Sequence, residues 1–181
     1  MNGRVEIRLA GTGGQGMVLA GIILADAAIR DSKCAVQTQS YGPEARGGAS
    51  SSEVIIADEE IDYPEIVQAD ILLCMSQQAC DKYYSSLKRN GLLVVDTTYV
   101  RRAPTSRAIR ADLTTWAVEA TEREITASVV ALGFLVGLTD VVSRQALERA
   151  VLARAPRGTG ESNARALDRG LAEAAKLRQQ A

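Results

Sequence analysis

Apolar and polar positions along the first half of the chain follow the patterns of β-strands. The stretch VEIRLA alternates between the two classes, which predicts a strand over residues 5–10. The short continuous apolar runs DILLCM and LLVVD are typical of buried strands and predict strands at 70–75 and 92–96. Weaker patterns predict the remaining strands, at 33–40, 51–56 and 108–110.

Helical spacing of apolar residues appears between these strands and takes over after residue 124. We expect helices over 17–30, 77–87, 125–138, from Ser143 to 153, and from Asn163 toward 180. Ser143 and Asn163 are expected to cap the last two helices, and Asp112 to cap the turn after the strand at 108–110. Gly91 is expected just beyond the end of the 77–87 helix.

The order of these elements predicts the fold class. A strand, a glycine loop and a buried helix open the chain, and this order predicts a parallel sheet. We therefore expect an α/β protein, a Rossmann-like three-layer sandwich with a mostly parallel central sheet and a helical C-terminal part. No repeat or linker divides the chain, so residues 1–181 are expected to form a single domain.

Composition narrows the chemistry. A net charge of −1 carries no footprint of nucleic-acid binding, and no apolar stretch approaches the length of a membrane span. No secretory signal is seen, so a cytoplasmic location is expected. The chain has no histidine, which removes the commonest general base and metal ligand. Its three cysteines form no CxxC motif and are expected to be reduced and buried, with no zinc or iron–sulfur site.

The loop GTGGQG carries a G-x-G-x-x-G pattern between a strand and a helix, formed by Gly11, Thr12, Gly13, Gly14, Gln15 and Gly16. Such a loop can bind an anion at the positive end of the helix, as in dinucleotide-binding proteins. The acidic residue that would bind the ribose is missing, because the end of the second predicted strand and the residue after it read Gln39, Ser40 and Tyr41. Two roles remain possible for this loop: a tight turn that lets the helix pack on the sheet, or a turn that also contacts a ligand or a partner. Gln15 could bond a partner or its own backbone.

A second glycine-rich stretch, YGPEARGG, follows the second predicted strand. In open α/β sheets, ligands and partners bind at the edge where parallel strands end, and both loops are expected there. The stretch is either a plain turn or a partner interface. The residues proposed for the interface are Tyr41, Gly42, Pro43, Glu44, Arg46 and Gly47.

Taken together, four stretches resemble a known family: GTGGQGMVLAGIILADAA, VQTQSYGPEARGGASSSEVIIADEEIDYP, ADILLCMSQQA and LKRNGLLVVD. They resemble the gamma subunit of 2-oxoacid:ferredoxin oxidoreductases, most of all the 2-oxoglutarate type, and an internal domain of single-chain pyruvate:ferredoxin oxidoreductases. The resemblance runs over residues 5–96 and continues more loosely through 131–138 and 161–170.

The resemblance implies a role in a larger enzyme. That enzyme converts a 2-oxoacid, coenzyme A (CoA) and oxidised ferredoxin to acyl-CoA, carbon dioxide and reduced ferredoxin. The resemblance also implies that this chain holds no catalytic residue, cofactor or metal. Thiamine diphosphate, Mg²⁺ and iron–sulfur clusters would lie on alpha, beta and delta-type partner subunits. The glycine loop would face a partner or CoA, and the isolated chain could form a homodimer.

Two other hypotheses come from different classes. One is a free-standing dinucleotide-binding oxidoreductase that uses the GTGGQG loop, which the missing ribose-binding acid disfavours. The other is a regulatory or scaffolding protein that has kept the fold without the complex.

Overall fold

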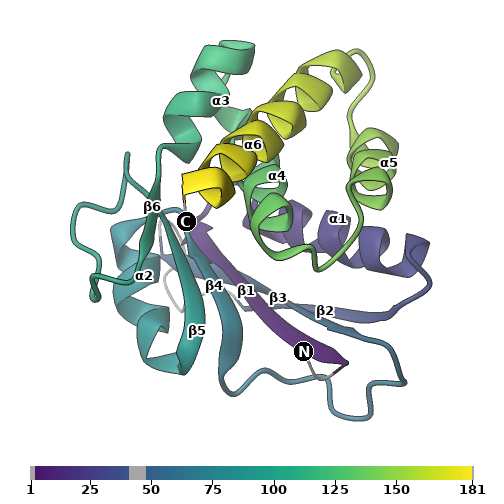
Figure 1. Cartoon of the computed structure of the whole chain (residues 1–181), viewed down its shortest axis with the longest axis vertical. Helices are drawn as coiled ribbons and strands as arrows, with labels where there is room; N and C mark the ends of the chain where they lie inside the picture. The colour runs from purple at the N-terminus through teal and green to yellow at the C-terminus, as the bar shows by residue number, and fades with distance from the viewer. Residues whose placement is uncertain (1–2, 41–47, 181) are drawn as a thin grey trace.

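The computed structural model describes residues 3–40 and 48–180. At the centre of these residues lies a six-stranded sheet with the order β2-β3-β1-β4-β5-β6 (Figure 1). Its strands are β1 (Arg4–Thr12), β2 (Cys34–Ser40), β3 (Ala49–Ala57), β4 (Ala69–Cys74), β5 (Leu87–Asp96) and β6 (Ile109–Ala111).

The sheet is mixed, with five strands running one way and β3 running the other. β1, β4, β5 and β6 pair in parallel, whereas β3 is antiparallel to both β1 and β2. The predicted mostly parallel sheet is confirmed. The reversal of β3 has a simple cause, because the connection from β2 to β3 is much shorter than the dozen or more residues that a parallel crossover needs.

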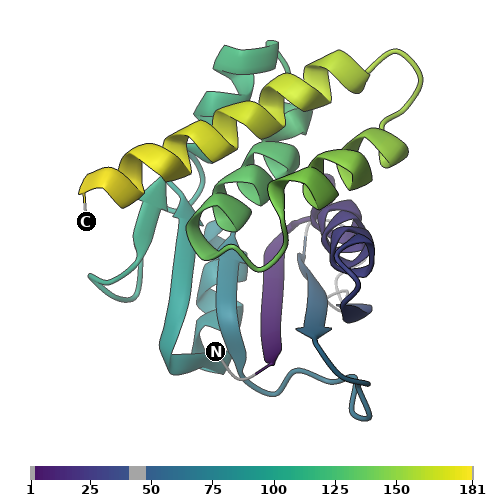
Figure 2. The same ribbon diagram turned by 45° about the vertical axis from the view of Figure 1, so that its right-hand side comes forward.

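Helices cover both faces of the sheet, which makes the three predicted layers (Figures 1 and 2). One hydrophobic cluster joins five helices to one face of the strands, and a smaller cluster joins α2 to the other face. The helices are α1 (Met17–Arg30), α2 (Gln77–Tyr83), α3 (Leu113–Thr121), α4 (Ala127–Thr139), α5 (Arg144–Arg154) and α6 (Gly160–Gln180).

The most buried helix is α4, whose first ten residues are all buried. It is apolar all round, as expected of a helix covered on every side. Helix α6 lies directly along it. A Cβ atom placed on Gly170 of α6 would lie 2.1 Å from the backbone oxygen of Val130 and 2.7 Å from the backbone nitrogen of Phe134. Only glycine therefore lets the two helix backbones come so close.

Two expectations about β5 and its preceding helix are wrong. Helix α2 ends at Tyr83, a 3₁₀ turn follows over Tyr84–Ser86, and β5 begins already at Leu87. Gly91 is therefore inside β5 and does not end a helix. The polar stretch LKRN has little strand propensity of its own. Its first residue, Leu87, pairs with Ala69 of β4, and after a register shift the pairing resumes at Leu92.

Of the predicted capping residues, one is confirmed and two do not cap a helix. The hydroxyl of Ser143 accepts a hydrogen bond from the backbone N–H of Ala146 (3.1 Å), which confirms this cap. Asn163 does not cap α6, because the helix begins at Gly160, and its side-chain amide donates instead to the backbone oxygen of Thr159 (2.9 Å). Asp112 stands at the cap position of α3, a helix not predicted from the sequence, but its side chain makes no capping bond.

Candidate functional site

The glycine loop joins β1 to α1 at the edge where β1, β4, β5 and β6 end, here called the carboxyl edge. Gly11 and Thr12 still belong to β1, so the turn is shorter than the sequence predicts. Gly14 and Gly16 have φ angles of 94° and 75°, in the left-handed region that favours glycine. The turn itself therefore requires these two glycines, and the exposed Gly13 forms its open tip.

The side chain of Gln15 ties this loop to two strands. Its Oε1 accepts hydrogen bonds from the backbone N–H of Thr12 (2.8 Å) and from the Thr12 hydroxyl (3.1 Å). Its Nε2 donates to the backbone oxygen of Met75, directly after β4 (2.9 Å). A Cβ atom on Gly11 would lie 2.6 Å from Gln15 Oε1, so Gly11 makes room for this amide. Of the two roles considered for Gln15, the structure shows the bond to its own backbone.

The first turn of α1 has backbone N–H groups that no side chain of the described residues accepts a hydrogen bond from. Gly16 is the residue before the helix and has no side chain to cap it. Among the described residues, no side chain accepts a bond from the N–H groups of Met17, Val18 or Leu19. These groups carry the positive end of the helix dipole. They can receive a carbonyl, a carboxylate or a phosphate oxygen from another molecule.

Apolar side chains stand exposed beside this loop. A cavity of about 190 Å³ is lined by Gly14, Gln15, Met75, Thr114, Glu124, Ile125 and Ala127. Ile125 at its rim is 70% exposed, and Leu19 in the first turn of α1 is 43% exposed. Tyr99 is 41% exposed and donates a hydrogen bond from its hydroxyl to Glu124 (2.5 Å). This mixture of apolar area and polar anchors suits a protein contact.

A buried carboxylate supports the same edge. Asp96 at the end of β5 is fully buried and accepts bonds from the backbone N–H (3.1 Å) and the hydroxyl (2.8 Å) of Thr114. Burial raises the pKa of Asp96, and the Thr114 bonds oppose part of that rise. Because Thr114 lies in the first turn of α3, Asp96 fixes that helix to the sheet. Sequence reasoning did not single out Asp96.

The second predicted site, Tyr41, Gly42, Pro43, Glu44, Arg46 and Gly47, lies outside the described residues, so its role as an interface stays a prediction. The residues that flank it are described. Ser40 pairs with Ser51, and Thr12, at the start of the glycine loop, pairs with Ala49. Both flanking strands therefore meet the carboxyl edge beside the glycine loop.

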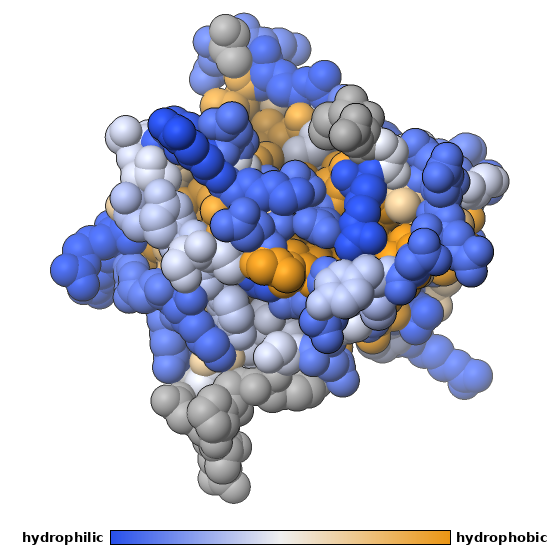
Figure 3. Space-filling model, turned by 90° about the horizontal axis from the view of Figure 1, so that it is seen from below, coloured by the Kyte–Doolittle hydropathy of each residue, from blue (hydrophilic) through white to orange (hydrophobic). Residues whose placement is uncertain are grey.

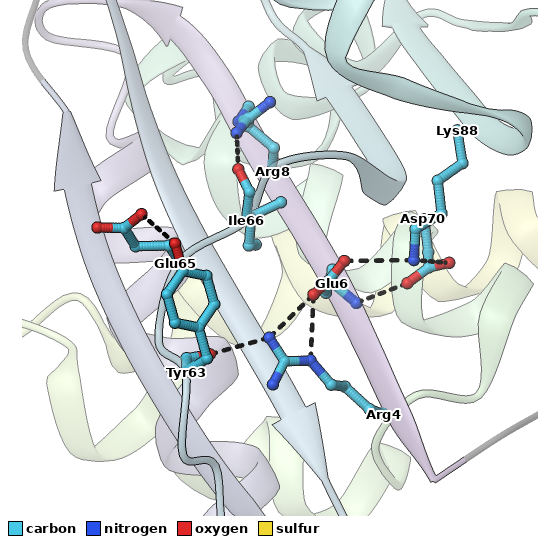
Figure 4. A network of polar contacts seen from close by, with 8 residues as sticks. All are labelled: Arg4, Glu6, Arg8, Tyr63, Glu65, Ile66, Asp70 and Lys88. Carbon is cyan, nitrogen blue, oxygen red and sulfur yellow. Dashed lines mark hydrogen bonds and ion pairs between the residues drawn. The ribbon is translucent and has the colours of Figure 1, made fainter.

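The opposite edge of the sheet holds a polar network that the sequence did not reveal. Lys88 forms ion pairs with Asp70 (2.8 Å) and Glu6 (3.2 Å), and Arg4 pairs with Glu6 (2.9 Å) (Figure 4). Buried Arg8 pairs with Glu53 on β3 (2.7 Å). A cavity of about 710 Å³ lies at this edge, and Figure 3 views the same side, where hydrophobic residues show between hydrophilic ones. The charges that line this larger cavity compensate one another, so we regard the carboxyl edge as the better candidate.

Comparison with known proteins identifies the family. The pyruvate ferredoxin/flavodoxin oxidoreductase family matches residues 6–173. The chain belongs to this family. It is 47% identical over 182 residues to the 2-oxoglutarate synthase subunit KorC of Methanocaldococcus jannaschii, covering 96% of each. The solved gamma subunit of a keto/oxoacid ferredoxin oxidoreductase from Geobacter sulfurreducens superposes with a TM-score of 0.87 at 48% identity, covering 96% of this chain and 98% of that one.

A more distant relative gives a useful contrast within the family. The pyruvate synthase subunit PorC of Methanothermobacter marburgensis is 31% identical over 165 residues, covering 90% of this chain and 93% of that subunit. The comparisons confirm the predicted family and support its main functional hypothesis. They give no support to the free-standing dinucleotide-binding oxidoreductase. The structure agrees, because β2, the strand that follows α1, does not pair with β1. The antiparallel β3 lies between them, where a dinucleotide-binding fold has its parallel ribose-binding strand.

The cysteines do not fit an iron–sulfur cluster. Cys74 and Cys80 are buried side by side, where their mutual hydrogen bond and burial raise the pKa of Cys74. Cys34 is exposed, contrary to expectation, at the start of the outer strand β2. Within residues 3–40 and 48–180, no group of three or more histidine, cysteine or carboxylate side chains could hold a metal ion. In the same residues, no helix is long and apolar enough to cross a membrane.

Proposed function

We propose that this chain is the gamma subunit of a 2-oxoglutarate:ferredoxin oxidoreductase. The observation that carries the proposal is its 47% identity, along nearly its whole length, to a 2-oxoglutarate synthase subunit. Identity to a pyruvate synthase subunit of similar length is only 31%. The substrate assigned here follows from this difference.

The complex would oxidise 2-oxoglutarate and join the acyl group to CoA. One carbon leaves as carbon dioxide, and the two electrons released reduce two ferredoxins. Thiamine diphosphate with Mg²⁺ and the iron–sulfur clusters would be bound by the alpha, beta and delta-type partner subunits. That division of labour suits a chain without histidine whose cysteines do not cluster.

The role proposed for this chain is to dock onto its partners through the carboxyl edge. Three features support it: the uncapped first turn of α1, the exposed Ile125 and Leu19, and the second glycine-rich loop that starts from the same edge. The N–H groups of α1 suit a partner carbonyl and also a phosphate of CoA. We favour the partner contact, because exposed apolar area surrounds these donors.

Residues 1–181 are proposed to form one domain, because the described strands share one sheet. A cytoplasmic location is proposed for the complex, where reduced cysteines such as the three here persist.

Reconstitution with partner subunits tests the proposal. The chain should be purified alone and together with the products of the neighbouring genes, under exclusion of oxygen. We expect the complex to reduce ferredoxin with 2-oxoglutarate and CoA, and the isolated chain to be inactive. Pyruvate should be the poorer substrate. Failure to recover thiamine-binding and iron–sulfur partners, or turnover by the isolated chain, would contradict the proposal.

The second glycine-rich loop needs its own test. If it forms an interface, the double variant Glu44→Ala and Arg46→Ala should keep its melting temperature and lose assembly. Retention of both properties would mean that the stretch is only a turn.

A further inference from the structure

Positive charge is concentrated in one part of the chain. The whole sequence is almost balanced, with 21 lysines and arginines against 22 acidic residues. Residues 88–110 nevertheless contain six cations and one acid, Asp96, which is fully buried and bonded to Thr114. The surface of this segment is therefore strongly positive.

Folding brings these cations together along the side of the sheet that ends in β6. Residues 97–108, which connect β5 to β6, stand out from the sheet (Figure 1). Arg107 donates to the backbone oxygen of Arg89 on β5 (2.9 Å), and Arg110 donates to that of Val100 (3.3 Å). The backbone of Arg102 bonds with the side chain of Gln77 on α2 in both directions (3.0 Å each). The connection is thus fixed at three points.

Five exposed arginines result, which we call the arginine surface: Arg89, Arg101, Arg102, Arg107 and Arg110. Within the described residues, none of the five forms an ion pair, although nine other cationic side chains do. Asp81 and Asp112 lie at its margins, where they accept hydrogen bonds from Gln77 and Thr97.

A cavity of about 240 Å³ opens within this surface. Its lining includes the cations Lys88, Arg89 and Arg107 and the hydroxyl residues Ser85 and Thr105, and it includes no acidic residue. Lys88 is already paired with Asp70 and Glu6, so the two arginines supply the charge that is not compensated. Guanidinium groups are planar forks that bind carboxylates through two parallel bonds.

We infer that the arginine surface binds an acidic face of a partner subunit, with one partner carboxylate seated in the cavity. This inference rests on the proposed function. A protein partner is favoured over a small anion because the five arginines are spread over β5, β6 and the connection between them, an area wider than one phosphate group covers. Arginine is also enriched at protein interfaces, whereas lysine is depleted.

The test measures binding to the reconstituted partner subunits. Two double variants remove charge from the surface, Arg101→Gln with Arg102→Gln and Arg89→Gln with Arg107→Gln. The matched control is Arg154→Gln with Arg157→Gln, because both of these arginines are exposed, lie far along the chain and form no ion pair in the described residues. Dissociation constants would be compared at 50 and 300 mM NaCl, and melting temperatures of the isolated chains would be recorded.

We expect each double variant to bind about two- to thirty-fold more weakly at low salt, as loss of two partly exposed ion pairs implies. The difference should shrink at high salt because screening weakens the wild-type contact. Binding by the control should be unchanged, and so should the melting temperatures of the control and of the variant with Arg101→Gln and Arg102→Gln. The variant with Arg89→Gln and Arg107→Gln also loses the bond from Arg107 to the Arg89 backbone, so its melting temperature should fall by at most about 6 °C. Unaltered binding by both double variants would refute the inference and leave the proposed function intact, whereas a wild-type chain that binds no partner would overturn both.

A small anion is the rival occupant. Inorganic pyrophosphate would be added to the isolated chain at constant ionic strength. A saturable rise in melting temperature that is lost with Arg107→Gln would replace the protein partner by a phosphate-type ligand. No rise is the result that the inference requires.

Discussion

Replacement of Gln15 tests whether the glycine loop is held by its own side chain. The Gln15 amide makes three hydrogen bonds, two to Thr12 and one to Met75. Each such bond contributes about 0.5–1.5 kcal/mol net. Since Gln15 is only half-buried, water can replace part of this contribution. We expect Gln15→Ala to lower the free energy of unfolding by about 1–3 kcal/mol.

Urea unfolding followed by circular dichroism measures this loss. For a chain of this length, it corresponds to a fall in melting temperature of about 2–12 °C. Gln39→Ala is the matched control, because Gln39 is exposed on the outer strand β2 and its side chain makes no hydrogen bond in the described residues. The control should stay within about 0.5 kcal/mol of wild type.

A second substitution separates the donor from the acceptor. Gln15→Glu keeps the oxygen that faces Thr12 but turns a carboxylate toward the Met75 carbonyl oxygen. That contact raises the pKa of the new carboxyl group, so the variant should regain stability as the pH falls and the group is protonated. If Gln15→Ala is as stable as Gln39→Ala, the loop does not depend on this side chain. If Gln15→Ala is also unable to assemble with the partner subunits while keeping this stability, Gln15 contacts a partner.

Two further predictions concern the helices. Gly170→Ala should destabilise the chain by about 1–3 kcal/mol because the new methyl group would meet the Val130 backbone. Gly160→Ala, on the same helix, should be neutral or slightly stabilising, because its methyl group would come no nearer than 3.9 Å to Leu152 Cδ2. Equal stability of the two variants would show that α4 and α6 can move apart. Asp96→Asn should cost more stability at pH 4.5 than at pH 7. Burial raises the pKa of Asp96 in the folded state, so the wild-type protein loses stability as the pH rises above the ordinary pKa of an aspartate, and asparagine does not share that loss. A cost independent of pH, measured by urea unfolding, would contradict this.

The parts of the fold that local pattern decides could be predicted from the sequence. Helix α1 begins and ends where expected because glycines precede it and its apolar residues are continuous. The start of β5 and the whole of α3 could not be predicted. Of the residues LKRN, only Leu87 pairs with β4, across a register shift that the sequence does not reveal. The threonines of α3 weaken its helical signal. The reversal of β3, in contrast, was implied by its short connection to β2.

The candidate site divides in the same way. The glycine loop is visible in the sequence because its pattern is local. The role of Gln15 is not visible, because its partner Met75 lies 60 residues away. Nor does the sequence show that Arg107 folds back onto Arg89. Long-range contacts of this kind exist only once the sheet has formed.

The burial of α4 has a consequence for synthesis on the ribosome. This helix is apolar on every side, and α6, which packs along it, follows only at residues 160–180. A nascent chain from which α4, but not yet α6, has emerged from the ribosome therefore exposes an apolar surface that is prone to aggregate. The core cannot close until these residues emerge, so chaperones should engage the chain during that interval.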